Sequence, residues 1–216
     1  TLSSAQAELA RARIREADLS GRARVEVRDY RQLAPSEPFD RIASVGMFEH
    51  VGRGRMHEYF RTVHRLLRPG GLFLNHGIIE SPTRRAGGWR TALRRLVWRE
   101  GSFIDRDVFP DGDVVPLALE IAAAEAAGFE TRDVESLRPH YVRTLRAWVG
   151  RLEARYDDAV RAAGETAPRT WRLYMSASAH AFAMAHIGLC QVLFARPDAA
   201  GRAPLPLTRE DLYSTH

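Results

Sequence analysis

Two kinds of hydrophobic pattern alternate along the whole chain, and this alternation restricts its possible folds more than any other feature. Short apolar segments typical of β-strands follow longer segments with the apolar spacing of amphipathic helices. Strands are expected at residues 25–30, 39–45, 72–79, 129–137 and 189–195, and helices at 4–17, 55–68, 114–127, 139–163 and 170–185. This order predicts an α/β fold, with a doubly wound, mainly parallel sheet that carries helices on both faces.

The beginning of this order is incomplete for such a sheet. A doubly wound sheet normally opens with a strand, a glycine-rich turn and a helix that together receive a cofactor. Here the chain starts at the helix that would follow this unit, as a fragment or a truncated reading frame would. We therefore expect a fold that lacks its first strand–loop–helix unit, with one domain at residues 1–196 and a proline-rich tail at 197–216.

The basic charge of the chain comes from arginine alone. There are 32 arginines and no lysine against 27 acidic residues, which gives a net charge of +5 and a pI near 9.9. Excess positive charge favours anionic partners, namely nucleic acid, acidic lipid or a charged cofactor, and charge by itself does not choose among them. Because no recognition motif accompanies the charge, we expect no binding of nucleic acid.

The sequence contains no segment typical of a membrane anchor. It has no run of about eighteen apolar residues, and the opening TLSSAQAELARAR lacks the apolar centre of a secretory signal. We expect a cytoplasmic protein that can attach peripherally to the inner membrane. The lone cysteine, Cys190, lies in the apolar segment IGLCQVLF and is expected to fill the core.

A dense polar motif, SVGMFEHVG at residues 44–52, comes at the end of the strand expected at 39–45. In open α/β sheets ligands bind beyond the carboxyl ends of the strands, so Glu49 and His50 should lie at such a crevice. His76 comes late in the next strand and should face the same place, which would make a polar site. Geometry alone equally allows Glu49 to cap the following helix and His76 to be a hydrogen-bonded core histidine.

Several motifs occur in the order found in one enzyme family. They are DYRQL, FDRIASVGMFEHVG, LLRPGGLFLNHGI, FPDG, HYVRTLRAW and QVLFAR. With them nearly the whole chain resembles the cyclopropane fatty acid synthases and the related mycolic acid cyclopropane synthases. MFEHVG together with HYVRTLRAW is specific to this family, whereas FDRI and LRPGG are shared by many methyltransferases. The resemblance implies a Rossmann-like class I methyltransferase fold, S-adenosylmethionine as the methyl donor and a lipid acyl chain as the substrate.

Within this resemblance, the opening TLSSAQ corresponds to the family's TLSxxQ segment. The residues that it implies beside S-adenosylmethionine are Thr1, Leu2, Ser3, Gln6, Asp29 and Tyr30. Short hydroxyl and amide groups suit a ribose and a methionine tail, and the DY pair corresponds to a strand end beside the adenine. Ser3 can also be the N-cap of the first helix, and Tyr30 can also be a core residue.

The resemblance further implies that Glu49, His76 and Tyr141 surround a bicarbonate ion. Methylation of an alkene gives a carbocation, and a base must remove a proton from the added methyl group before a ring can close. Bicarbonate held by a carboxyl group, an imidazole and a phenol would be that base, although Tyr141 can also be a plain buried tyrosine at a helix start. Ser178 stands where the family commonly has cysteine, so no covalent role is expected there, and no metal site is expected.

Two other functions remain open at this point. A related methyltransferase would leave a methyl or methylene branch, since both routes share the carbocation. A chain without the cofactor loop would instead be an inactive module that binds lipid surfaces. Residues 84–99 interleave arginine with tryptophan and leucine, as in a basic helix on an anionic membrane surface, and a solvated loop fits their two glycines equally well. Each of these possible functions is compatible with an oligomer.

Overall fold

The computed structural model describes residues 1–34, 37–81 and 113–213. The chain forms two compact units, Thr1–Pro38 and Phe39–His216. The basic stretch 84–99 and the FPDG motif lie outside the described residues.

The first unit contains helix α1 (Ser4–Glu16) and a short 3-10 helix, η1 (Tyr30–Gln32). The strand expected at residues 25–30 is wrong. In the described part of the chain this segment joins no sheet, and the Arg28 N–H instead donates to the carbonyl of Thr1 at 3.0 Å. Alternating side chains alone do not make a strand, because a strand also needs a neighbour for its backbone groups.

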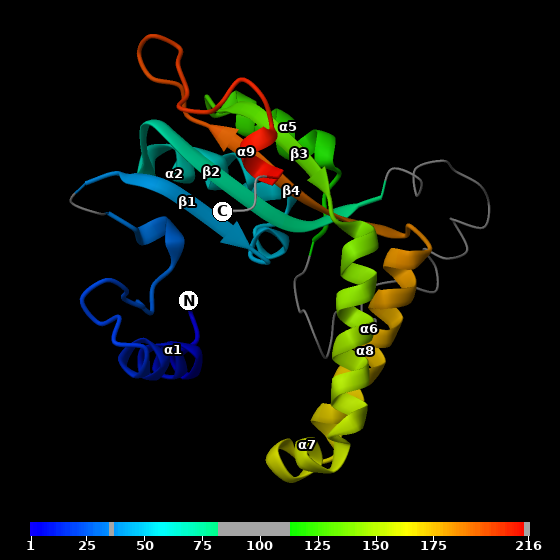
Figure 1. The fold of residues 1–216 in the computed structure, drawn as a ribbon. Helices are drawn as coiled ribbons and strands as arrows, with labels where there is room; N and C mark the ends of the chain where they lie inside the picture. Colours follow the sequence, from blue (N-terminus) through cyan, green and yellow to red (C-terminus); the bar gives the residue numbers. More distant parts are fainter. Residues whose placement is uncertain (35–36, 82–112, 214–216) are drawn as a thin grey trace. The chain divides into compact units, whose positions relative to one another are not determined.

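The second unit is built on a four-stranded sheet with the order β1–β2–β4–β3 (Figure 1). Its strands are β1 (Phe39–Val45), β2 (Leu67–Glu80), β3 (Glu130–Ser136) and β4 (Ile187–Ala195). β1 runs parallel to β2, whereas β4 lies antiparallel to both β2 and β3. The expected α/β class is confirmed, and the sheet of the described residues is mixed where a mainly parallel one was expected. Hydrophobic periodicity locates a strand without giving its direction.

Two helices, α2 (Met56–Leu66) and α5 (Leu117–Ala126), pack beside the sheet, and α9 (Glu210–Tyr213) lies in the tail. Between β3 and β4 the chain forms α6 (Arg138–Ala154), α7 (Tyr156–Ala163) and α8 (Thr166–Ala183). α6 and α8 lie side by side and α7 turns at their far end, so we call these three helices the arm (Figure 1). The single helix expected at 139–163 is broken at Arg155, whose backbone leaves the helical region with φ −130° and ψ 35°.

The core of the second unit lies between β2 and the helices α2 and α5. Along β2 the side chains alternate, with Phe73 buried on the side of these helices and its neighbours half-buried on the other. Six aromatic rings pack edge-on or tilted in this core: Phe48, Tyr59, Phe60, Phe73, Phe129 and Phe194. None of the described helices has both the length and the apolar composition that a bilayer span requires.

Phe60 allows a test of this core. Its side chain is 0% exposed and contacts all five of the other rings. Phe60→Ala should lower the free energy of unfolding by about 3–5 kcal/mol, because both transfer energy and packing are lost. Phe39, which is 37% exposed, is the matched control, and Phe39→Ala should lower it by less than about 1 kcal/mol. If urea unfolding shows the same loss of stability for both variants, the described aromatic core is wrong.

Candidate functional site

The Glu49 side chain returns to the sheet just beyond the end of β1. Gly46 turns the chain with a φ of +63°, and its N–H donates to the carbonyl of His76 at 3.0 Å. After this turn the short helix η2 (Phe48–His50) brings the Glu49 carboxylate back to β2, where Oε1 accepts the N–H of Ile78 at 2.7 Å. The carboxylate therefore satisfies a strand N–H that β1 is too short to reach.

A glycine in β2 leaves space for this carboxylate. A Cβ added at Gly77 would meet the Phe48 Cβ at 3.4 Å and the Glu49 Cδ at 3.7 Å. Phe48 is buried and holds η2 against the strand. The alternative role of Glu49 as the cap of the next helix is wrong, since α2 begins at Met56 with Arg55 in the N-cap position.

The second oxygen of Glu49 has a different environment. Oε2 is buried, and within the part of the chain that the structure describes it has no hydrogen-bond partner. A buried carboxylate oxygen without a donor is unfavourable unless a ligand, water or proton satisfies it. This oxygen therefore marks the position at which a hydrogen-bond donor would bind.

Tyr141 shares the electrostatic environment of Glu49. Burial raises the pKa of its phenol, and the negative charge of Glu49 raises it further. The Tyr141 ring packs edge-on against Trp148 at 6.0 Å and Phe182 at 5.1 Å, at the base of the arm. The Ile78 side chain packs against the same apolar cluster of the arm, which connects Tyr141 to the strand that binds Glu49.

Tyr174 in α8 is a residue that the sequence analysis missed. Burial raises the pKa of its phenol, a hydrogen bond with Ser178 opposes this, and Tyr141 and Glu49 raise it further. Ser178 is thus a buried hydrogen-bonding group beside Tyr174. No sequence signal found Tyr174, because an aromatic residue on an amphipathic helix is typical of a core position.

His76 is placed differently from Glu49 and Tyr141. It lies opposite Val45 of β1 and Gln191 of β4 in the sheet, on the face away from Asn75 and Gly77. Among the described residues, no hydrogen bond or ion pair joins its imidazole to Glu49 or Tyr141. The charge of Glu49 acts on the pKa of Tyr141, and a shared site of Glu49, His76 and Tyr141 stays a prediction.

A buried polar chain, also missed from sequence, crosses the core behind Glu49. The Tyr59 hydroxyl donates to Asn75 Oδ1 at 2.9 Å, and Asn75 Nδ2 donates to Glu120 Oε1 at 2.8 Å. Burial raises the pKa of Glu120 to about 7, the Asn75 hydrogen bond opposes this, and the charge of Glu49 adds to it. The available signal was one acidic residue inside the apolar run LALEIAAA.

The six residues expected around the cofactor all lie in the first unit, where local hydrogen bonds connect several of them. The Thr1 hydroxyl donates to Gln6 Oε1 at 2.8 Å, and the Ser3 hydroxyl accepts the N–H of Gln6 at 3.3 Å as the N-cap of α1. The carbonyl of Thr1 accepts the Arg28 N–H, which brings the opening segment next to Asp29 and Tyr30. Leu2 is largely exposed and Tyr30 is half-buried. Their contact with a cofactor remains a prediction.

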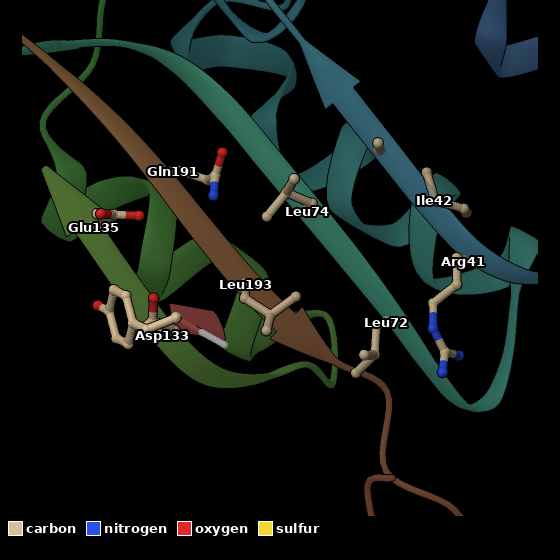
Figure 2. Close-up of a pocket in the computed structure, with 10 residues that line it drawn as sticks. Arg41, Ile42, Leu72, Leu74, Asp133, Glu135, Gln191 and Leu193 are labelled. Atoms are coloured by element: carbon tan, nitrogen blue, oxygen red, sulfur yellow. The ribbon is translucent and has the colours of Figure 1, made fainter. Parts of the chain in front are cut away.

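A hollow of about 600 Å³ lies on the face of the sheet away from α2 and α5. Figure 2 shows it lined by aliphatic side chains of three strands, with Asp133 and Glu135 at one side. Asp133 already pairs with Arg209 at 3.1 Å, and none of the predicted site residues lines the hollow. The aliphatic side chains of a sheet face form a packing surface, so we do not assign the candidate site to this hollow.

Comparison with known proteins agrees with the motifs around Glu49 and Tyr141. The family model described as mycolic acid cyclopropane synthetase matches residues 1–192. The chain belongs to this family. One relative, a probable fatty acid methyltransferase of Pseudomonas putida, is 40% identical to this chain over 213 residues. These residues cover 99% of this chain and 52% of the relative.

Other family members give the same result. The cyclopropane-fatty-acyl-phospholipid synthase of Escherichia coli K12 is 34% identical over 91% of this chain and 46% of its own length. The crystal structure of the mycolic acid cyclopropane synthase CmaA1 complexed with SAH and CTAB has a TM-score of 0.78 and 30% identity, and the match covers 90% of this chain and 68% of that chain. The present chain spans about half the length of the curated relatives that it matches.

The coupling of Glu49 and Tyr141 can be measured directly. In Glu49→Gln the negative charge is gone, so the pKa of Tyr141 should fall towards its ordinary value of 10.0 while burial keeps it raised. NMR titration of ring-labelled tyrosine measures this, with Tyr141→Phe for assignment. Glu153→Gln, at an exposed position of the same helix, is the matched control and should leave this pKa unchanged. A Tyr141 pKa that does not respond to Glu49→Gln would exclude the shared site.

Proposed function

We propose that the protein transfers a methyl group from S-adenosylmethionine to the double bond of an unsaturated lipid acyl chain, and that the product is a cyclopropane. The observation that carries this proposal is the Glu49 carboxylate, which lies within electrostatic reach of Tyr141. One of its oxygens is fixed by β2, and the other is buried with no donor among the described residues. The family and the names of its relatives support the reaction class.

The first unit would hold the methyl donor. S-adenosylmethionine supplies an electrophilic methyl group on a sulfonium centre. Thr1, Ser3 and Gln6 present hydroxyl and amide groups around the start of α1, where helix N–H groups favour a carboxylate such as that of a methionine tail. Asp29 follows within the same unit and can accept hydrogen bonds from a ribose. CmaA1, a relative in this family, is complexed with SAH.

The second unit would provide the groups for the alkene. When the double bond attacks the methyl carbon, a new C–C bond forms, the S–CH₃ bond breaks with its electron pair going to sulfur, and the acyl chain becomes a carbocation. The negative Glu49 carboxylate, held in a partly buried site, would stabilise this positive charge. The aromatic rings of Tyr141 and Trp148, which pack edge-on against each other, carry negative π-faces that would also stabilise a cation.

Bicarbonate fits the donor and acceptor pattern of this site. It would accept a proton from the added methyl group, so that the released C–H electron pair closes the ring. The orphaned Oε2 of Glu49 accepts a hydrogen bond, which the O–H of bicarbonate can donate, and the Tyr141 phenol can donate to its oxygens. Raised pKa values keep the phenols of Tyr141 and Tyr174 protonated and able to donate.

The product and the reacting chain can be tested by lipid analysis. The intact protein, expressed in bacteria that make unsaturated phospholipids and lack such an enzyme, should convert monounsaturated acyl chains to chains with one more methylene. NMR should show cyclopropyl protons, because ring closure follows proton loss. A methyl or methylene branch would assign the protein to the branching reaction. Unchanged lipids would favour the alternative function, in which the protein is an inactive module that binds lipid surfaces.

Removal of the predicted site groups tests the mechanism. Glu49→Gln and Tyr141→Phe should each lower kcat at least about a hundredfold, the range typical of a lost acid–base or charge-stabilising group. The Kd for S-adenosylmethionine, measured by calorimetry, should stay within about twofold because these residues do not belong to the first unit. Glu153→Gln is again the matched control. Full turnover in Glu49→Gln would remove Glu49 from the reaction.

The arm would place the protein on its lipid substrate. Residues 138–183 carry eight arginines against four acidic residues, so the arm holds most of the net positive charge of the chain. Trp171 is 48% exposed and Leu173 is 57% exposed, in a helix that also carries Arg169 and Arg172. Exposed tryptophan and leucine among arginines are typical of elements that rest on an anionic bilayer.

Binding to vesicles tests the role of the arm. Wild-type protein should bind vesicles of anionic phospholipid, bind neutral vesicles less, and lose affinity as salt rises. The double substitution Trp171→Ala with Leu173→Ala should weaken binding roughly tenfold, because two apolar anchors are lost. Leu207→Ala, at a fully exposed position outside the arm, is the control. Equal binding of all three proteins would exclude the arm as the membrane contact.

A further inference from the structure

Glu120 is a buried acid that the proposed reaction does not use. It lies in α5, is 2% exposed and accepts a hydrogen bond from Asn75, which itself accepts one from Tyr59. All three side chains are buried, and they come from α5, β2 and α2. The Asn75 side chain lies with its oxygen towards the Tyr59 hydroxyl and its amide N–H towards Glu120, so it is held at both ends.

The hydrogen-bonded side chains Tyr59, Asn75 and Glu120 are joined to the part of β2 that lies beside the candidate site. Asn75 comes directly before His76, and three residues later the Ile78 N–H donates to Glu49. Consecutive side chains of a strand point to opposite faces of the sheet. Because the Asn75 side chain is held in place, the backbone of β2 is fixed with the His76 side chain on the opposite face. Gly77, between them, approaches Glu49 and Phe48 closely, so a small shift of β2 would move the Glu49 carboxylate.

The titratable groups around Glu120 show the same proximity. Glu49 raises the pKa of Glu120, and Glu120 raises the pKa of Cys190, whose value reaches about 11 mainly through burial. Cys190 lies opposite Gly77 in the ladder of β2 and β4. Glu49, Cys190 and the Tyr59 phenol are thus the titratable groups of the described residues that face Glu120, from η2, β4 and α2.

We propose that Glu120 is a positioning residue for the methyl transfer: through Asn75 it holds the segment of β2 that carries His76 and the Ile78 N–H, and thereby sets the position of the Glu49 carboxylate. This rests on the proposed function. Glu120 touches neither substrate nor cofactor in this scheme. Its protonated form adds no second negative charge beside Glu49, whereas its ionised form would repel that carboxylate.

Two substitutions at Glu120 separate the hydrogen bond from the charge. Glu120→Leu removes the acceptor for Asn75 and should lower kcat at least about tenfold, while the Kd for S-adenosylmethionine stays unchanged. Glu120→Gln keeps a carbonyl oxygen for Asn75 and should restore most of this turnover. The control is Glu125→Gln in the same helix, where the exposed carboxylate accepts a hydrogen bond from the Thr131 hydroxyl.

The pH dependence gives a readout that a loss of packing alone would not change. The pKa of Glu120 is raised from 4.5 to about 7, so the folded protein retains a proton that the unfolded chain releases. The stability that Glu120 contributes is therefore complete below pH 4.5 and is lost as the pH rises through about 7. The Ile78 amide resonance should show a step in the same range. Both effects should be absent in Glu120→Gln.

The outcomes distinguish this inference from the proposed function. If wild-type protein does not modify lipids, the proposed function fails, while the Ile78 amide still reports whether Glu120 acts on Glu49. An Ile78 resonance without a step near pH 7 in wild type, or with the same step in Glu120→Gln, overturns the inference. So does unchanged kcat in Glu120→Leu. If Glu120→Leu does not fold, the comparison of wild type with Glu120→Gln still decides.

Discussion

The hydrogen bond between the Ile78 N–H and the Glu49 carboxylate connects the fold of the second unit to its chemistry. β2 is the one strand that pairs with both β1 and β4, so its backbone is held on two sides for most of its length. Beyond the end of β1 the carboxylate takes over the pairing, and the charged acceptor makes this hydrogen bond stronger than a neutral one. The strand therefore fixes the position of the Glu49 carboxylate, which the short helix η2 carries.

The arm extends this rigidity to the second member of the site. Tyr141 and Tyr174 stand on α6 and α8, whose apolar faces meet in a cluster that also takes the Ile78 side chain. The same residue of β2 thus binds Glu49 through its backbone and the arm through its side chain. The pKa values of both phenols are raised because burial removes water from around them, and the charge of Glu49 adds to this.

Sequence patterns located most of the second unit, because local spacing decides where a helix or strand lies. β1 was predicted with its observed bounds, whereas the segment at 25–30 had the right alternation and no partner strand. Strand direction and the insertion of β4 between β2 and β3 depend on contacts distant in sequence, which periodicity does not report. Glu49 was found from a family motif, while Glu120 belongs to no motif and its relation to Asn75 arises only in three dimensions.

Two carboxyl groups differ in burial here: Glu49 is half-buried and Glu120 is buried. The charge of Glu49 disfavours a second charge nearby, so a proton is best placed on the carboxyl group that is more deeply buried. Glu120 is that group, and its hydrogen bond from Asn75 does not offset the burial. Glu49 accepts the Ile78 N–H with its Oε1. Burial thus favours a proton on Glu120, while the Oε2 of Glu49 has no hydrogen-bond partner among the described residues.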